Sequence, residues 1–185
     1  MFLVSQNLEK YMSFPKETVI RINLAWVESL TALENTIQNF ENDIYIDLPV
    51  GRTKPPSNSY SIDDLKKIID KHSNIKYLAI SNVENAEDLI EYSEIFGSSL
   101  SIVPKIESKK GIENIKDISS VMHGKKSIML DHDDLFSDLI RRNVAPSDFF
   151  SYIEKLEDFC AKNSIALLKT RGVIFSDKDK YSYER

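Results

Sequence analysis

Residues 103–107, with the sequence VPKIE, form the most informative segment of this chain. Successive side chains of a β-strand point to opposite faces, so Lys105 and Glu107 share one face and Ile106 lies on the other. A cation and an anion on the inner face of a core strand are costly to bury unless they are paired or bind a ligand. The segment therefore predicts a strand with one aliphatic face and one charged face.

Other predicted strands also combine an aliphatic face with a polar end. Residues 19–24 (VIRINL) place Arg21 and Asn23 opposite aliphatic side chains, and residues 44–48 (IYIDL) place Asp47 opposite Ile and Leu side chains. Three further predicted strands end in polar residues, namely Ser81, Asp131 and Thr170. Polar groups at many strand ends are typical of a (β/α) barrel, whereas an open doubly wound sheet concentrates them at one switch point. We therefore expect a barrel.

Strand-like segments alternate with segments of helical period, which predicts a parallel sheet covered by helices, an α/β fold. The expected strands are Phe2–Ser5, Thr18–Leu24, Asp43–Leu48, Lys76–Ser81, Leu100–Glu107, Ser127–Asp131 and Ile165–Thr170. The expected helices are Asn7–Met12, Val27–Phe40, Ile62–Lys71, Ala86–Phe96, Gly111–Val121, Leu135–Arg141 and Asp148–Lys162. We expect a TIM-barrel-like fold of about seven strands, incomplete at its C-terminus. Its open edge predicts a homo-oligomer, most simply a dimer.

Composition narrows the class of protein. The 185 residues carry 24 Lys and Arg against 29 Asp and Glu, so the net charge is −5 and nucleic acid is not an expected partner. The single cysteine, Cys160, excludes an internal disulfide framework and a multi-cysteine zinc site. No apolar run approaches the length of a membrane span. We expect a soluble cytoplasmic protein with no membrane partner, one domain at residues 1–175 and a charged tail at residues 176–185.

Carboxylates at two strand ends form a candidate metal site. Residues 128–135 (IMLDHDDL) bring Asp131 and Asp134 to the turn after one strand, and Glu107 ends the strand before it. Carboxylate oxygens suit Mg²⁺ or Mn²⁺, so these three residues are the predicted metal ligands. Two alternatives remain open. Glu107 could form a structural ion pair with Lys105, and Asp134 could cap the following helix.

Basic and polar groups at the same strand ends form a candidate anion site. Arg21 offers a fork of N–H donors suited to a carboxylate or phosphate, and Lys105 would place a positive charge beside a substrate oxyanion. These two residues are the candidate catalytic residues. The predicted substrate-binding residues are Asn23, Asp47, Arg52, Ser81 and Thr170. An equally consistent interpretation of Arg21 is a salt bridge to Asp47 on the next strand.

Several segments, in order, resemble the barrel domain of pyruvate kinase. Arg21-Ile22-Asn23 is similar to an Arg-x-Asn strand of that family, residues 43–49 resemble its Asp-Leu-Pro motif, and residues 104–118 resemble its Lys-Ile-Glu strand and following helix. Further similar segments are residues 76–89, 128–135 and 168–171. The similarity covers most of residues 4–171 at low identity. The citrate lyase β-subunit and HpcH-type aldolase family shares the metal layout and is the second nearest.

The resemblance implies roles for particular residues. Glu107 and Asp134 would hold Mg²⁺, and Lys105 would stabilise a pyruvate enolate or a transferring phosphoryl group. Arg21 would bind a phosphate or carboxylate, and Thr170 would face the substrate. The implied chemistry is that of a 2-oxo acid that chelates the metal through its carboxylate and carbonyl oxygens.

The resemblance leaves two functions open. The lid domain of pyruvate kinase is missing, because residues 48–60 alone join the third strand to the next helix, so complete pyruvate kinase activity is not expected. The first hypothesis is a Mg²⁺- or Mn²⁺-dependent lyase, or phosphoryl or enolpyruvyl transferase, acting on a pyruvate- or phosphoenolpyruvate-like acid. The second is a catalytically reduced barrel that binds a small carboxylate, a phosphate or a protein partner.

Overall fold

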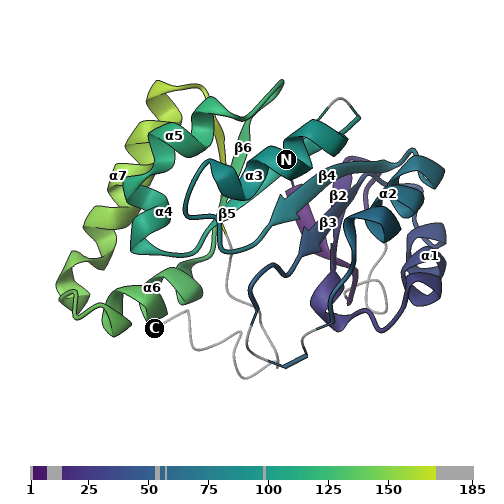
Figure 1. The fold of residues 1–185 in the computed structure, drawn as a ribbon, viewed down its shortest axis with the longest axis horizontal. Helices are drawn as coiled ribbons and strands as arrows, with labels where there is room; N and C mark the ends of the chain where they lie inside the picture. Colours follow the sequence, from purple (N-terminus) through teal and green to yellow (C-terminus); the bar gives the residue numbers. More distant parts are fainter. Residues whose placement is uncertain (1, 8–13, 53–54, 57, 98, 170–185) are drawn as a thin grey trace.

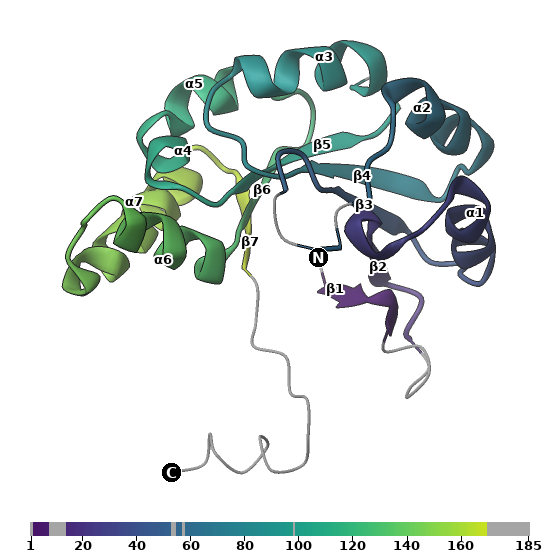
Figure 2. The same ribbon diagram turned by 60° about the horizontal axis from the view of Figure 1, so that its bottom comes forward.

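The computed structural model describes residues 2–7, 14–52, 55–56, 58–97 and 99–169. Its centre is a sheet of seven parallel strands whose order in space is their order in the chain. The strands are β1 (Phe2–Ser5), β2 (Thr18–Asn23), β3 (Ile44–Leu48), β4 (Ile75–Ile80), β5 (Ser101–Ile106), β6 (Ser127–Leu130) and β7 (Ala166–Lys169). Figure 2 shows that the sheet curls into an arc with β1 and β7 at its two ends. The expected α/β class, with a parallel sheet curved like part of a barrel, is confirmed.

Helices follow the convex side of the sheet (Figures 1 and 2). They are α1 (Leu30–Gln38), α2 (Ile62–Lys71), α3 (Glu87–Phe96), α4 (Lys109–Glu113), α5 (Ile115–Ser120), α6 (His132–Arg141) and α7 (Phe149–Lys162), with short 3₁₀ turns η2 (Leu24–Trp26) and η3 (Pro146–Asp148). Within the described ranges, no helix combines the length and the apolar character needed to span a membrane.

Alternate residues of β2 to β7 enter two different apolar clusters. The larger cluster lies between the sheet and the helices, and Ile20 and Ile22 of β2 are fully buried in it. The smaller cluster takes one buried residue from each of five adjacent strands, namely Val19, Tyr45, Ala79, Val103 and Met129. Two residues later along the same five strands, the same face becomes polar, with Arg21, Asp47, Ser81, Lys105 and Asp131. The strands therefore carry an apolar layer below a polar layer on the inner face.

Two expected helices begin earlier than the sequence predicts. The helix α6 begins at His132 because the side chain of Asp131 caps it. The helix expected from residue 111 begins at Lys109, with Ser108 as its cap, and it is divided at Asn114 into α4 and α5. Residues 8–12 of the first expected helix lie outside the described residues.

Cys160 is expected to resist thiol-specific reagents while the chain is folded. It lies in α7 with 2% of its surface exposed, and burial raises the pKa of its thiol to about 11. At pH 8 about one such thiol in a thousand is ionised, and the thiolate is the reactive form. We expect its reaction with a chromogenic disulfide reagent to be at least ~100-fold slower in native buffer than in urea. Equal rates would show that the thiol is open to solvent.

Candidate metal centre

Charged side chains from adjacent strands meet at the carboxyl ends of the sheet. Arg21 lies on β2, Asp47 on β3 and Lys105 on β5, while Glu107 directly follows β5. Asp47, Lys105 and Glu107 are 1%, 5% and 5% exposed. Parallel strands end at the same edge of a sheet, so the inner-face residues of neighbouring strands converge there. The polar strand ends predicted from the sequence therefore form one cluster, in which Asp47, Lys105 and Glu107 are buried and Arg21 is partly exposed.

Each charge in this cluster has a partner of opposite sign. Asp47 Oδ2 accepts hydrogen bonds from Arg21 Nη2 and from Arg21 Nε, the latter at 2.9 Å. Lys105 Nζ lies 3.2 Å from Asp47 Oδ1 and 2.9 Å from Glu107 Oε1, and it donates to Ser81 Oγ at 3.1 Å. Both ion-pair alternatives left open by the sequence, Arg21–Asp47 and Lys105–Glu107, are therefore present.

Burial and these ion pairs act against each other on the pKa of each group. Burial favours a higher pKa for the Asp47 carboxyl, but Lys105 and Arg21 outweigh it and lower the pKa. Burial likewise works to lower the pKa of Lys105, yet Asp47 and Glu107 raise it. For Glu107 burial dominates and raises the pKa, despite Lys105 and the Asn82 N–H. Asp47 is therefore the fixed negative charge between the two cations.

Asn82 is a site residue that the sequence analysis did not identify. Its backbone N–H donates to Glu107 Oε2 at 2.7 Å, and its side-chain Nδ2 donates to the Val50 carbonyl at 2.7 Å. Its φ of 55° lies in the left-handed region, which asparagine adopts more readily than most other residues with a side chain. An asparagine immediately after the polar strand end at Ser81 was the available indication of such a turn.

The three predicted metal ligands are brought together. Glu107, Asp131 and Asp134 each offer one carboxylate oxygen, and these oxygens lie within 4.8 Å of one another. The Asp131 N–H donates to the Ile106 carbonyl at 3.3 Å, which extends the β5–β6 ladder by one step and places Asp131 beside Glu107. The turn after β6 then returns Asp134 to the same place. The register of one strand pair thus assembles the acidic group.

The three carboxylate oxygens could coordinate one hard divalent cation if their side chains moved slightly closer together. Mg²⁺ binds oxygen at about 2.1 Å, so two of its ligand oxygens lie about 3 to 4.2 Å apart. A spread of up to 4.8 Å requires side-chain movement of about 1 Å or less. Both Glu107 oxygens already accept contacts, but each carboxylate oxygen has a second lone pair that can bind a metal. The residues present therefore fit Mg²⁺ or Mn²⁺.

The cap of α6 differs from the alternative raised for Asp134. The capping side chain is that of Asp131, whose Oδ1 accepts the Asp134 N–H at 3.3 Å. The cap alternative for Asp134 was therefore wrong, because the helix begins three residues earlier than expected. Asp131 therefore both caps α6 and belongs to the acidic group.

Two predicted substrate-binding residues are used elsewhere. Asn23 Oδ1 accepts the Ala25 N–H at 3.0 Å and caps η2. Arg52 Nε donates to the Pro56 carbonyl at 2.8 Å, which holds its own loop. Among the described residues, no hydrogen bond or ion pair joins either side chain to the Asp47–Lys105 cluster. Thr170 lies outside the described residues.

Comparison with known proteins gives a likeness of fold. No family model matches the chain, and no curated protein matches it. Among 302 solved chains that match is RipC from Yersinia pestis, with a TM-score of 0.63, 15% sequence identity, and coverage of 99% of this chain and 80% of that chain. At that identity the likeness concerns the path of the backbone, so this chain is similar in fold to RipC.

Proposed function

We propose that this chain is a Mg²⁺- or Mn²⁺-dependent enzyme that acts on a small pyruvate- or phosphoenolpyruvate-like acid through a metal-stabilised enolate, as a lyase or a phosphoryl or enolpyruvyl transferase. The observation that carries the proposal is the acidic group of Glu107, Asp131 and Asp134 next to the buried Lys105 ammonium. Part of the same proposal is that the curved sheet is a (β/α) barrel of the pyruvate kinase type. The layered inner face and the polar strand ends support it.

The balance of charge supports a divalent cation in this centre. Two cationic and four anionic side chains meet there, so the net charge is −2 when all are ionised: Arg21, Lys105, Asp47, Glu107, Asp131 and Asp134. An excess of negative charge in a partly buried site repels an anionic substrate. One divalent cation would cancel that excess. We therefore expect a carboxylate ligand to bind only after the metal.

In the proposed reaction, different residues of the chain would bind the metal and stabilise the enolate. Glu107, Asp131 and Asp134 would hold the metal, which would supply positive charge to the carboxylate and carbonyl oxygens of a 2-oxo acid. Lys105 is held by Asp47 and Ser81 at a fixed position beside Glu107. A preorganised ammonium in a site with little water stabilises developing negative charge without reorganisation. Its role would therefore be to stabilise the enolate oxygen.

Two observations favour a second candidate function, a binding module without turnover. Arg21 and Lys105 already direct their charges at Asp47, and the connection from β3 to α2 is too short to carry a lid domain. A cluster whose charges are internally paired can serve structure alone. In that case a small carboxylate or phosphate would bind without any metal requirement. The predicted homo-oligomer stays a prediction in either case, with β1 and β7 at the ends of the described sheet.

Calorimetric titration of the full chain with Mg²⁺ and Mn²⁺, alone and followed by oxalate, tests the proposal. We expect metal binding in the wild type, oxalate binding only in the presence of metal, and at least a roughly ten-fold loss of metal affinity in Glu107→Gln. Asp117→Asn, which neutralises an exposed carboxylate on α5, is the matched control and should bind like the wild type. Absence of metal binding would exclude the enzyme, and oxalate binding without metal would establish the binding module.

A further inference from the structure

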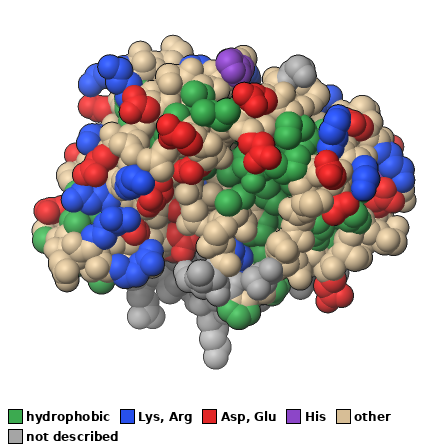
Figure 3. All heavy atoms as spheres, in the orientation of Figure 1, with side chains coloured by type: hydrophobic (Ala, Val, Ile, Leu, Met, Phe, Trp, Pro, Cys, Tyr) green, Lys and Arg blue, Asp and Glu red, His purple; other side chains and the backbone are tan. Residues whose placement is uncertain are grey.

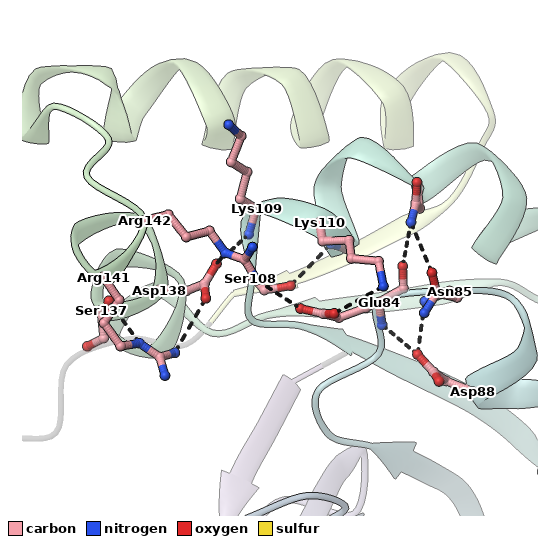
Figure 4. Close-up of polar contacts among 12 residues, drawn as sticks. Glu84, Asn85, Asp88, Ser108, Lys109, Lys110, Ser137, Asp138, Arg141 and Arg142 are labelled. Carbon is pink, nitrogen blue, oxygen red and sulfur yellow. Dashed lines mark hydrogen bonds and ion pairs between the residues drawn. The ribbon is translucent and has the colours of Figure 1, made fainter.

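A second group of charged residues lies on the outer surface, where α4 and α6 approach each other (Figure 4). Its centre is Asp138 of α6, which is 5% exposed. Asp138 Oδ2 accepts the backbone N–H of Lys109, the first residue of α4, at 2.9 Å, and it accepts Arg142 Nε at 2.8 Å. Figure 3 shows basic side chains gathered over this part of the molecule, at the left of the view.

The group continues to the loop between β4 and α3. Arg142 Nη2 lies 3.5 Å from Glu84 Oε1, and Lys110 Nζ lies 3.4 Å from Glu84 Oε2. Asn114 Nδ2 donates to the Glu84 carbonyl at 2.9 Å. Three segments that are distant in the sequence are therefore joined: the β4–α3 loop, the start of α4 and the end of α6 (Figure 4).

The same three segments carry the candidate metal centre on the other side of the sheet. The residue before the α4 cap is Glu107, and the β4–α3 loop holds Asn82, whose N–H binds Glu107. The helix α6 is capped by Asp131 and carries Asp134 in its first turn. Any displacement of α6 against α4 would therefore change the separation between Glu107 and the two aspartates.

A capping role alone does not account for Asp138. The start of α4 already has a cap, because Ser108 Oγ accepts the Gly111 N–H at 3.2 Å. Burying a carboxylate is costly unless its contacts are well placed. Asp138 contacts Arg141 of its own helix, at 3.4 Å from its Oδ1, but its other contacts run to α4 and, through Arg142, toward the β4–α3 loop. Groups behind metal ligands fix their orientation in this way and contribute to affinity.

We propose that Asp138 is a positioning residue, which sets the spacing of Glu107 against Asp131 and Asp134 by fixing α6 to α4 and to the β4–α3 loop. The inference rests on the proposed metal function, and it assigns to the outer group a role in that function. Arg142 is a second positioning residue, because it contacts both Asp138 of α6 and Glu84 of the β4–α3 loop and so links these two segments.

The test compares Asp138→Asn with the wild type in the full chain. Asparagine keeps the size of the side chain and one acceptor but removes the charge, so we expect Mn²⁺ affinity in calorimetry to fall about ten-fold. Hydrogen exchange followed by NMR should show the Asn82 amide exchanging at least ~10-fold faster, because its contact with Glu107 loosens. Ile37→Val, in α1, is the control, since it lowers the unfolding midpoint without touching these segments.

Further variants separate positioning from simple stabilisation. Arg142→Met should reproduce both effects, and Arg142→Lys should restore most of the Asn82 protection. Unchanged Mn²⁺ affinity and unchanged Asn82 exchange in Asp138→Asn would overturn the inference and leave Asp138 a purely structural group. If the wild type binds no Mn²⁺, the proposed function fails, and the Asn82 exchange rates alone decide whether Asp138 positions Glu107.

Discussion

Replacing Asp47 with asparagine is expected to lower the free energy of unfolding by about 3–5 kcal/mol at pH 7. Asp47 is 1% exposed and contacts both Arg21 and Lys105. Asparagine keeps the shape but removes the charge that compensates two cations, and a buried charge left without compensation costs far more than an exposed one. Of the two cations, Glu107 contacts Lys105 but not Arg21, so it cannot compensate both charges when Asp47 is removed.

The loss should depend on pH with a defined sign. The pKa of Asp47 is lowered by Lys105 and Arg21 against the effect of burial. Its contribution to stability is therefore complete above the ordinary aspartate pKa of about 3.9, and it disappears as the pH falls through the lower, folded value. The difference between wild type and variant should be constant from neutral pH down to about pH 5 and shrink below about pH 4.

Urea unfolding followed by circular dichroism measures the Asp47 effect. The matched control is Asp70→Asn, because Asp70 also pairs with a lysine, at 2.7 Å from Lys66, but its side chain is 58% exposed. We expect that control to change stability by about 0.5 kcal/mol or less, since exposed pairs within a helix contribute little. A loss below about 1 kcal/mol in Asp47→Asn would mean that solvent screens the cluster.

Gly111→Ala is expected to destabilise the chain by about 1–3 kcal/mol, although alanine favours helices more than glycine does. A Cβ at Gly111 would lie 2.7 Å from the Val83 carbonyl oxygen and 3.3 Å from Ile106 Cγ2. Val83 cannot retreat cheaply, because it is fully buried and its N–H donates to the Lys105 carbonyl at 3.3 Å. The clash with backbone must therefore move α4 or the β4–α3 loop.

The same displacement should reach the candidate metal centre, because Val83 follows Asn82 in the chain and the Asn82 N–H binds Glu107. We expect Gly111→Ala to weaken Mn²⁺ binding as well as to lower the urea midpoint. Lys116→Ala, an exposed position in α5, should leave stability within about 0.5 kcal/mol of the wild type. A Gly111→Ala protein as stable as the wild type would show that α4 has room to shift.

The sequence predicted the strands and which of their residues share the inner face. The alternation within each strand segment, such as residues 103–107, was sufficient for the faces, because a strand has a period of two whatever its neighbours are. It also predicted that Glu107, Asp131 and Asp134 lie together. That prediction needed only the rule that parallel strands end at one edge of a sheet.

Other features depended on contacts between segments that no local pattern encodes. The partner of Glu107 at Asn82 is a backbone N–H, and backbone donors are the same in every residue except proline. Asp134 was the only cap considered for α6, because the helix was expected from Leu135, but α6 begins at His132 and its cap is Asp131. Asn23 has an amide side chain that could bind a ligand, but its Oδ1 accepts the Ala25 N–H in a local turn instead.

The sequential order of the strands affects how the chain can fold while it is being synthesised. Among the described strands, β1 through β7, each pairs only with strands adjacent to it in the chain. A nascent chain leaving the ribosome can therefore add each new strand to an edge that already exists, without waiting for a distant partner to be translated. In a sheet whose first strand lies in the middle, the second edge of that strand is paired only after later segments emerge.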